Sequence, residues 1–160
     1  MEQEELNEII RKHQMWLNEE EGGEKATLRR ADLSHADMKG ANLKWADLRF
    51  ADLRGANLHG AVLRNANLDK AELYDVNLDY ADLKRASLAG ASLCNASMRS
   101  ADLREADLVS TALRDADLAG ANLNHTDLRW ANLIGAKMRQ EDMDKAALTK
   151  WQRDTIILCQ

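Results

Sequence analysis

Residues 26–60 read ATLRR ADLSH ADMKG ANLKW ADLRF ADLRG ANLHG, and this spacing of five decides the fold. The pattern continues without insertion or deletion to AALTK at 146–150, which makes 25 consecutive pentapeptides. The third position is Leu in 21 of them and Met in four, and the first position is Ala in 21. A period repeated this often indicates a repeat architecture built from one structural unit.

The period of five excludes both ordinary secondary structures. On an α-helix a step of five residues turns about 500°, so the leucines would not form one stripe. On a continuous strand an odd period would send successive leucines to opposite faces. A chain that bends once in every five residues buries the pattern, because the first and third positions share one side of each short segment. The remaining positions, rich in Asp, Asn, Arg, Lys, Ser and Gly, then face solvent.

These residues resemble the pentapeptide repeat family, whose pattern is Ala, then Asp or Asn, then Leu, then two variable residues. The resemblance covers residues 26–150. It implies an all-β solenoid, a right-handed quadrilateral β-helix in which four pentapeptides form one coil. About six coils would then make a rod about 30 Å long. In such a fold Leu fills the interior, and the Gly and Asn residues of the fifth position suit β-turns.

Three segments are predicted: a cap at 1–25, the β-helix at 26–150 and a tail at 151–160. Within 3–19, an apolar face recurs at helical spacing, formed by Leu6, Ile9, Ile10, His13, Trp16 and Leu17. We expect this amphipathic helix, stopped by the glycines at 22–23, to cover the open first coil.

The tail contains TIILC at 155–159, a short apolar run with β propensity. It either folds back as a cap or pairs with a second copy of the chain. Some family members dimerise through their C-terminal ends, so the resemblance allows a homodimer through this end.

The sequence carries no pattern typical of a catalytic, cofactor-binding or metal site. Four scattered histidines have no metal-ligand spacing, and Cys94 stands in an outward position without a base beside it. The second-position aspartates recur because the turns use them, so pairs of them do not indicate acid–base catalysis. We therefore expect a protein that is not an enzyme and that binds no cofactor.

Two sets of outward residues are candidates for a partner surface. Large exposed aromatic residues are enriched at protein interfaces, which favours the first set, Trp45, Phe50, Tyr74, Tyr80 and Trp130. Stacking at the implied coil length would align a basic column, Lys44, Arg64, Lys84 and Arg104. Asp82 and Asp102 lie on the same side, so local charge pairs are favoured over an anion-binding stripe.

The function expected from these features is a protein–protein interaction or scaffold module. The alternative is a DNA mimic that binds DNA gyrase or topoisomerase IV, an activity that the family resemblance implies. DNA mimicry needs a concentrated negative surface. Residues 26–150, however, contain 18 acidic and 18 basic residues, and the net charge of −5 comes from residues 1–25. The neutral rod disfavours mimicry. An effector delivered into host cells remains a further alternative.

The chain has no recognisable targeting or membrane signal. Its first residues, MEQEELNEII, are acidic and lack the apolar run of a secretory signal. No apolar run of about 18 residues occurs, so no membrane span is predicted. We expect a bacterial, cytoplasmic protein that does not bind nucleic acid directly.

Overall fold

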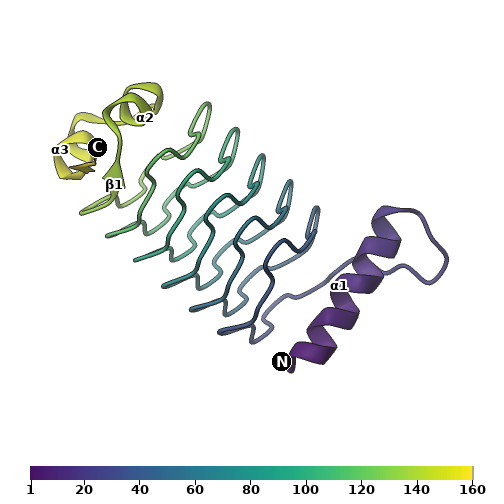
Figure 1. Ribbon diagram of the computed structural model, residues 1–160. Coiled ribbons are helices and arrows are strands. Elements are labelled where there is room, and N and C mark those ends of the chain that lie inside the picture. Colours follow the sequence, from purple (N-terminus) through teal and green to yellow (C-terminus); the bar gives the residue numbers. More distant parts are fainter. Residues whose placement is uncertain (160) are drawn as a thin grey trace.

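Coils of 20 residues stack in parallel along the repeat region. The computed structural model describes residues 1–159. Each bridge between neighbouring coils joins second-position residues 20 positions apart, from Thr27 with Asp47 to Asp117 with Lys137. Four pentapeptides therefore form one coil, as the resemblance implies. Figure 1 shows the coils stacked between one helix at the N-terminal end and two helices at the C-terminal end.

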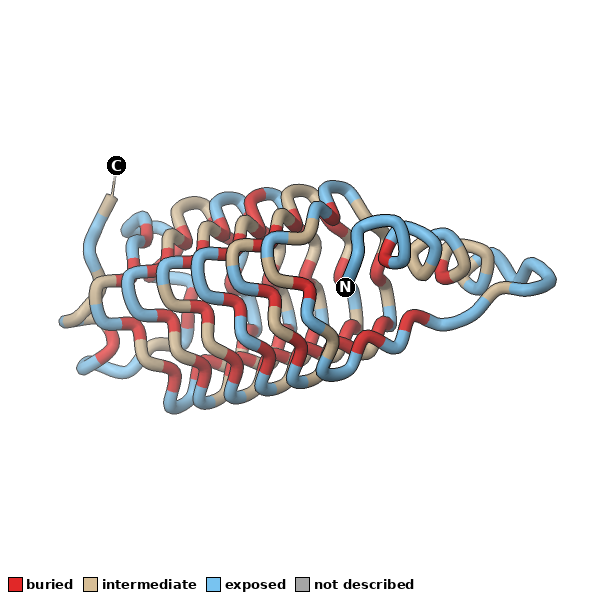
Figure 2. Tube along the Cα trace, turned by 90° about the horizontal axis from the view of Figure 1, so that it is seen from below, coloured by how far each residue is buried: buried red, intermediate tan, exposed pale blue. Residues whose placement is uncertain are grey.

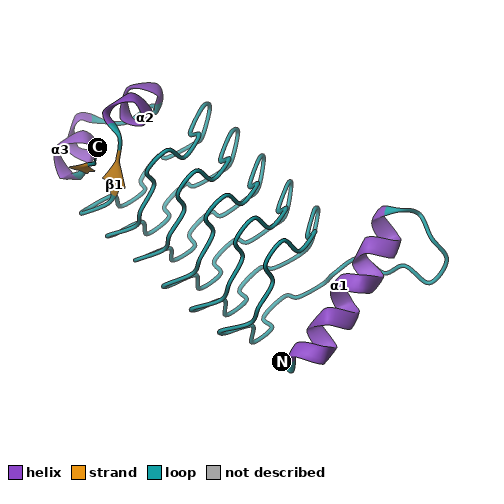
Figure 3. Cartoon of the chain, in the orientation of Figure 1, coloured by secondary structure: helices purple, strands orange, loops and turns teal. Residues whose placement is uncertain are grey.

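Each coil has four sides, which we label by their pentapeptides. Side A contains the pentapeptides that start at Ala26 and at every twentieth residue after it, and sides B, C and D start in the same way at Ala31, Ala36 and Ala41. Contacts between coils at residues 26–136 are single-residue bridges, and Figure 3 draws these segments as loops. The strand detail of the expected β-helix is therefore not confirmed, because a turn in every pentapeptide leaves no room for a longer ladder.

The third-position residues form the core of the stack. From Leu28 to Met138 each is at most 2% exposed, and the first-position residues are buried beside them from Ala46 onward. Figure 2 shows the buried positions recurring at the same place in successive coils. Thr111 and Thr126 replace Ala in this buried column, and each hydroxyl donates to a carbonyl of the coil before it, at 3.0 and 2.7 Å. Burial of these hydroxyls therefore leaves no donor unpaired.

The corners of the coils use a left-handed backbone conformation at every fifth position. These residues have positive φ from Arg30 (58°) to Gly135 (72°), and most are not glycine. The amide of Ala31 closes the first corner by donating to the Leu28 carbonyl at 3.1 Å, and the bond recurs at later corners. The left-handed conformation costs a residue with a side chain about 1–2 kcal/mol. Hydrogen bonds between coils, such as Arg30 N to Arg49 O at 3.0 Å, offset this cost.

Helix α1 (Gln3–Leu17) covers the first coil, in agreement with the expected N-terminal helix. The Gln3 side chain exchanges two hydrogen bonds with the Asp37 backbone, at 2.9 and 3.0 Å. His13 is fully buried between the Ala26 amide and the Lys44 carbonyl. Gly23 follows the helix where a Cβ would lie 2.3 Å from the backbone nitrogen of Trp16, so this position requires glycine. The helix thus covers the first coil and supplies hydrogen-bond partners to backbone groups of Ala26, Asp37 and Lys44.

The coils end earlier than the sequence pattern predicts. The period of five continues to Lys150, but after β1 (Lys137–Met138) the chain forms α2 (Gln140–Lys145) and α3 (Lys150–Thr155). Glu141 occupies the position where other repeats bury Ala, and an unpaired carboxylate is costly to bury. At the first turn of α2 its charge instead stabilises the helix. The helices α2 and α3 thus lie where the sequence pattern of the repeats still continues.

The tail folds back onto its own chain. Strand β2 (Ile157–Leu158) pairs in parallel with β1, joining Ile157 to Lys137 and Leu158 to Met138. The offset is again 20 residues, so β2 takes the place of the next coil after a detour through two helices. Of the two alternatives for TIILC, the structure contains the fold-back.

Candidate functional site

The five aromatic residues predicted to be outward are all exposed, but they do not form one surface. Phe50 and Trp130 lie on side A, Tyr74 on side B, Tyr80 on side C and Trp45 on side D. The Tyr74 hydroxyl accepts a hydrogen bond from the Asn95 amide at 2.8 Å. Tyr80 packs edge-on against His59 at 5.4 Å between ring centroids. Exposure was predictable for each residue, whereas their grouping was not.

The basic column on side D is largely neutralised by carboxylates. Arg104 makes an ion pair with Asp102 at 2.5 Å, Lys84 with Glu105 at 3.3 Å, and Arg64 with Asp82. The Arg104 guanidinium holds the pKa of Asp102 below its usual value. Three of the four residues of the predicted column are thus paired, and Lys44 is the fourth. Side D therefore presents mainly paired charges rather than an anion-binding stripe.

The C-terminal end exposes the largest group of apolar side chains. Trp130 is 85% exposed, and four further residues are exposed there: Ile134, Trp151, Ile157 and Leu158. A hollow of about 400 Å³ lies between Trp130 and Trp151, lined also by Ala131, Asn132, Thr149 and Gln152. Sequence reasoning selected Trp130 and the apolar run of the tail. It missed Trp151 and Ile134, which only the course of α3 and the last coil make neighbours of this end.

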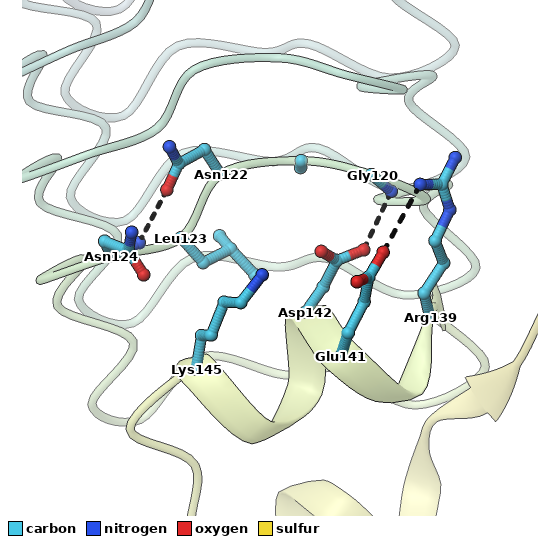
Figure 4. Close-up of a pocket in the computed structure, with 9 residues that line it drawn as sticks. Gly120, Asn122, Leu123, Asn124, Arg139, Glu141, Asp142 and Lys145 are labelled. Carbon is cyan, nitrogen blue, oxygen red and sulfur yellow. Dashed lines mark hydrogen bonds and ion pairs between the residues drawn. The ribbon is translucent and has the colours of Figure 1, made fainter.

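A smaller hollow of about 260 Å³ separates the last coil from α2 (Figure 4). Two pairs of its polar groups are bonded: Asp142 accepts from the Gly120 amide at 2.9 Å, and Arg139 pairs with Glu141 at 3.6 Å. Earlier in side C the corresponding amide, that of Gly60, donates to a carbonyl of the next coil. The Asp142 side chain therefore replaces a lost coil carbonyl, and this hollow is part of the C-terminal cap.

The other residues that could bind a metal ion or react chemically are dispersed. Within residues 1–159, no three His, Cys, Asp or Glu side chains are placed to hold a metal ion. The two cysteines, Cys94 and Cys159, are free thiols with intermediate exposure. None of the helices in this described part is long and apolar enough to span a membrane.

Comparison with known proteins identifies the repeats. A family model described as pentapeptide repeats matches residues 24–44, 41–79, 77–115 and 112–149, in 8 copies. The chain belongs to the pentapeptide repeat family. Members of this family fold as right-handed quadrilateral β-helices and are generally non-enzymatic structural or interaction modules. No curated protein sequence matches this pentapeptide repeat protein.

Solved structures that are similar to this pentapeptide repeat protein include the following three. HetL, involved in heterocyst differentiation regulation in the cyanobacterium Nostoc sp. strain PCC 7120, is 35% identical, with a TM-score of 0.36 and coverage of 72% of this chain and 67% of HetL. Rfr23 from the cyanobacterium Cyanothece 51142 is 33% identical, with a TM-score of 0.34 and coverage of 59% of this chain and 61% of Rfr23. QnrB1, a plasmid-mediated fluoroquinolone resistance protein, is 14% identical, with a TM-score of 0.46 and coverage of 84% of this chain and 90% of QnrB1.

Proposed function

We propose that this chain is a non-enzymatic scaffold that binds protein partners, built on the right-handed four-sided solenoid of its family. The exposed apolar C-terminal end carries the proposal. Trp130, Trp151, Ile134, Ile157 and Leu158 are all exposed at this end, and the two tryptophans line a hollow. Contiguous apolar side chains on a protein surface mark interaction sites. The rod provides a rigid support for such a surface, because each coil is bonded to the next along its length.

The occupant of this end is a second copy of the chain. Within the described residues β2 pairs only with β1, so its other edge is open. An open edge is a template for another strand, and an identical edge satisfies it in a two-fold symmetric pair. The exposed tryptophans of this end, Trp130 and Trp151, would then be buried by the same surface of the second copy. The four sides of each rod stay available to a different partner.

The oligomeric state tests this proposal. Wild-type protein is expected to sediment at twice the 18.0 kDa monomer mass. The double variant Trp151→Ser/Leu158→Lys is expected to be monomeric, because a lysine on the edge strand blocks pairing. Trp45→Ser, which removes an exposed tryptophan from side D, is the control and should stay dimeric. A monomeric wild-type protein at micromolar concentration would rule out the dimer.

The charge distribution disfavours the alternative of DNA mimicry toward DNA gyrase or topoisomerase IV. The repeats contain equal numbers of acidic and basic residues, and the carboxylates of Asp52, Asp102 and Asp127 are each engaged by a neighbouring arginine. A surface that imitates a duplex must present unpaired negative charge. Inhibition of gyrase supercoiling by the wild-type protein would favour that alternative over the scaffold.

A further inference from the structure

Two arginines depart from the ion pairing found for the other arginines of residues 1–159. The sequence has 13 arginines, and within residues 1–159 eleven of them form ion pairs with carboxylates. The two exceptions, Arg29 and Arg30, are adjacent and exposed on side A of the first coil. Because the two unpaired arginines are adjacent, the surroundings of residues 29–30 must account for their lack of a carboxylate partner.

Both arginines converge with a lysine on one exposed aromatic ring. The Phe50 ring centroid lies 5.5 Å from the Arg29 guanidinium carbon, 5.6 Å from that of Arg30 and 5.6 Å from the Lys70 ammonium nitrogen. Arg30, Phe50 and Lys70 occupy the same corner of three successive coils, each with positive φ. We call these four residues the Phe50 patch. Attraction of cations to an aromatic face holds the three charges together on a rigid backbone.

The nearest carboxylates of side A are engaged by other donors. Asp47 is held by Arg49 through two bonds of 2.8 and 2.6 Å. Asp69 accepts from the Ser87 hydroxyl and, at 3.1 Å, from the Ala89 amide. The positive charge of Arg29 contributes to lowering the pKa of Asp47, yet the two side chains form no ion pair. Three like charges therefore converge without a carboxylate of residues 1–159 bound to them, and a ligand with negative charges would remove their mutual repulsion.

We propose that the Phe50 patch binds an acidic segment of a protein partner. Arginine side chains bind carboxylates through paired hydrogen bonds, and the flat Phe50 ring offers packing area to an apolar residue between two acidic ones. The patch spans three coils, about 10 Å, which matches a short peptide better than a polynucleotide backbone. This inference rests on the proposed scaffold function, but it concerns the end opposite to the dimer surface.

Binding of a fluorescein-labelled oligoglutamate peptide, measured by fluorescence anisotropy at low salt, tests the proposal. Wild-type protein is expected to bind, and Arg29→Glu/Arg30→Glu is expected to weaken binding by at least about tenfold. Phe50→Leu, which removes the aromatic face but keeps an apolar side chain, should weaken it about threefold. The matched control is Lys39→Glu/Lys145→Glu, which changes the net charge equally using exposed lysines outside the patch. The control should bind like the wild type.

Three outcomes would overturn the proposal. The wild-type protein could fail to bind the peptide, or the control could lose as much affinity as the patch variant, which would reduce the effect to net charge. A single-stranded oligonucleotide of equal charge could also bind more tightly than the peptide, and lose this binding in the patch variant. Unchanged melting temperatures would show that the variants are folded. If the protein is dimeric but does not bind the peptide, the acidic-segment proposal fails and the proposed dimer stands.

Discussion

The second-position aspartate has two hydrogen-bonding roles in this chain. Its Oδ1 accepts the backbone amide two residues later, as in Asp52 with the Arg54 amide at 3.1 Å. Where that later residue is arginine, the guanidinium also binds the carboxylate, as in Arg104 with Asp102. These bonds hold the pKa of Asp52 and of Asp102 below the usual value. The recurring Asp-Leu-Arg thus fixes the turn and neutralises the charge of the same pentapeptide.

His13 is the residue from which we expect a pH effect on stability. Its Nδ1 accepts from the Ala26 amide at 3.1 Å, so the proton resides on Nε2, which donates to the Lys44 carbonyl at 3.0 Å. Burial lowers the His13 pKa, the nearby Lys25 charge also lowers it, and the Lys44 carbonyl opposes both. The unfolded chain therefore takes up this proton first. The His13 contribution to stability is complete above a pH of about 6.5 and is lost as the pH falls below it.

The measurement is the melting temperature between pH of about 7.5 and about 5. The wild-type value is expected to fall, and the protection factors of α1 amides, which correct for the slower intrinsic exchange at low pH, should decrease as the helix detaches from the first coil. His13→Gln is less stable overall but should lose the part of the pH dependence that His13 supplies. His59→Gln, which changes a histidine outside the cap, should retain it. Equal pH dependence in wild type and His13→Gln would contradict this role.

The elements differ in how well the sequence predicts them. The coils and α1 were predictable, because each slot of the pentapeptide and each apolar position of residues 3–17 repeats one environment many times. Helices α2 and α3 were not, because the period of five runs on through Lys150. The difference lies in the residues at 141–144, whose charges favour a helix start over a buried coil. The partner surfaces were predictable only as exposed residues, since the direction of a side chain across a corner depends on the stacked neighbours.

Gln152 connects α3 to the last coil, and its loss should loosen the C-terminal cap. This side chain is 3% exposed and donates to the carbonyls of Leu128 and Ala131 at 2.9 and 3.2 Å. In Gln152→Leu both buried carbonyls lose a donor, which we expect to cost about 1–3 kcal/mol. Urea unfolding gives the cost, and faster amide exchange across residues 149–159 would locate it. Gln140→Leu, which removes an exposed glutamine of α2, should cost less than about 0.5 kcal/mol. Equal costs for the two variants would contradict the capping role.

Charge divides the whole molecule into an acidic N-terminal end and a neutral rod. Residues 1–25 carry eight acidic and three basic residues, while the repeats balance. The Phe50 patch lies on the rod beside this acidic end, and the exposed apolar surface lies at the opposite end. The two proposed interfaces are therefore separated by the length of the rod. A dimer through the C-terminal ends would hold its two Phe50 patches far apart, so each could take its own acidic segment.

The whole stack should depend on each interior leucine according to its depth along the rod. Leu78 lies in the middle and is fully buried, with coils bonded on both sides. Leu78→Asp would place a carboxylate where no side chain can pair with it, and in a solenoid the loss spreads to the neighbouring coils. We expect a loss of at least about 4 kcal/mol in unfolding free energy. Leu148 holds the same slot of the repeat pattern but is half-buried after the coils end. Leu148→Asp should therefore cost less than half as much by urea unfolding, and equal losses would contradict the assignment of Leu78 to a continuous core and Leu148 to the cap.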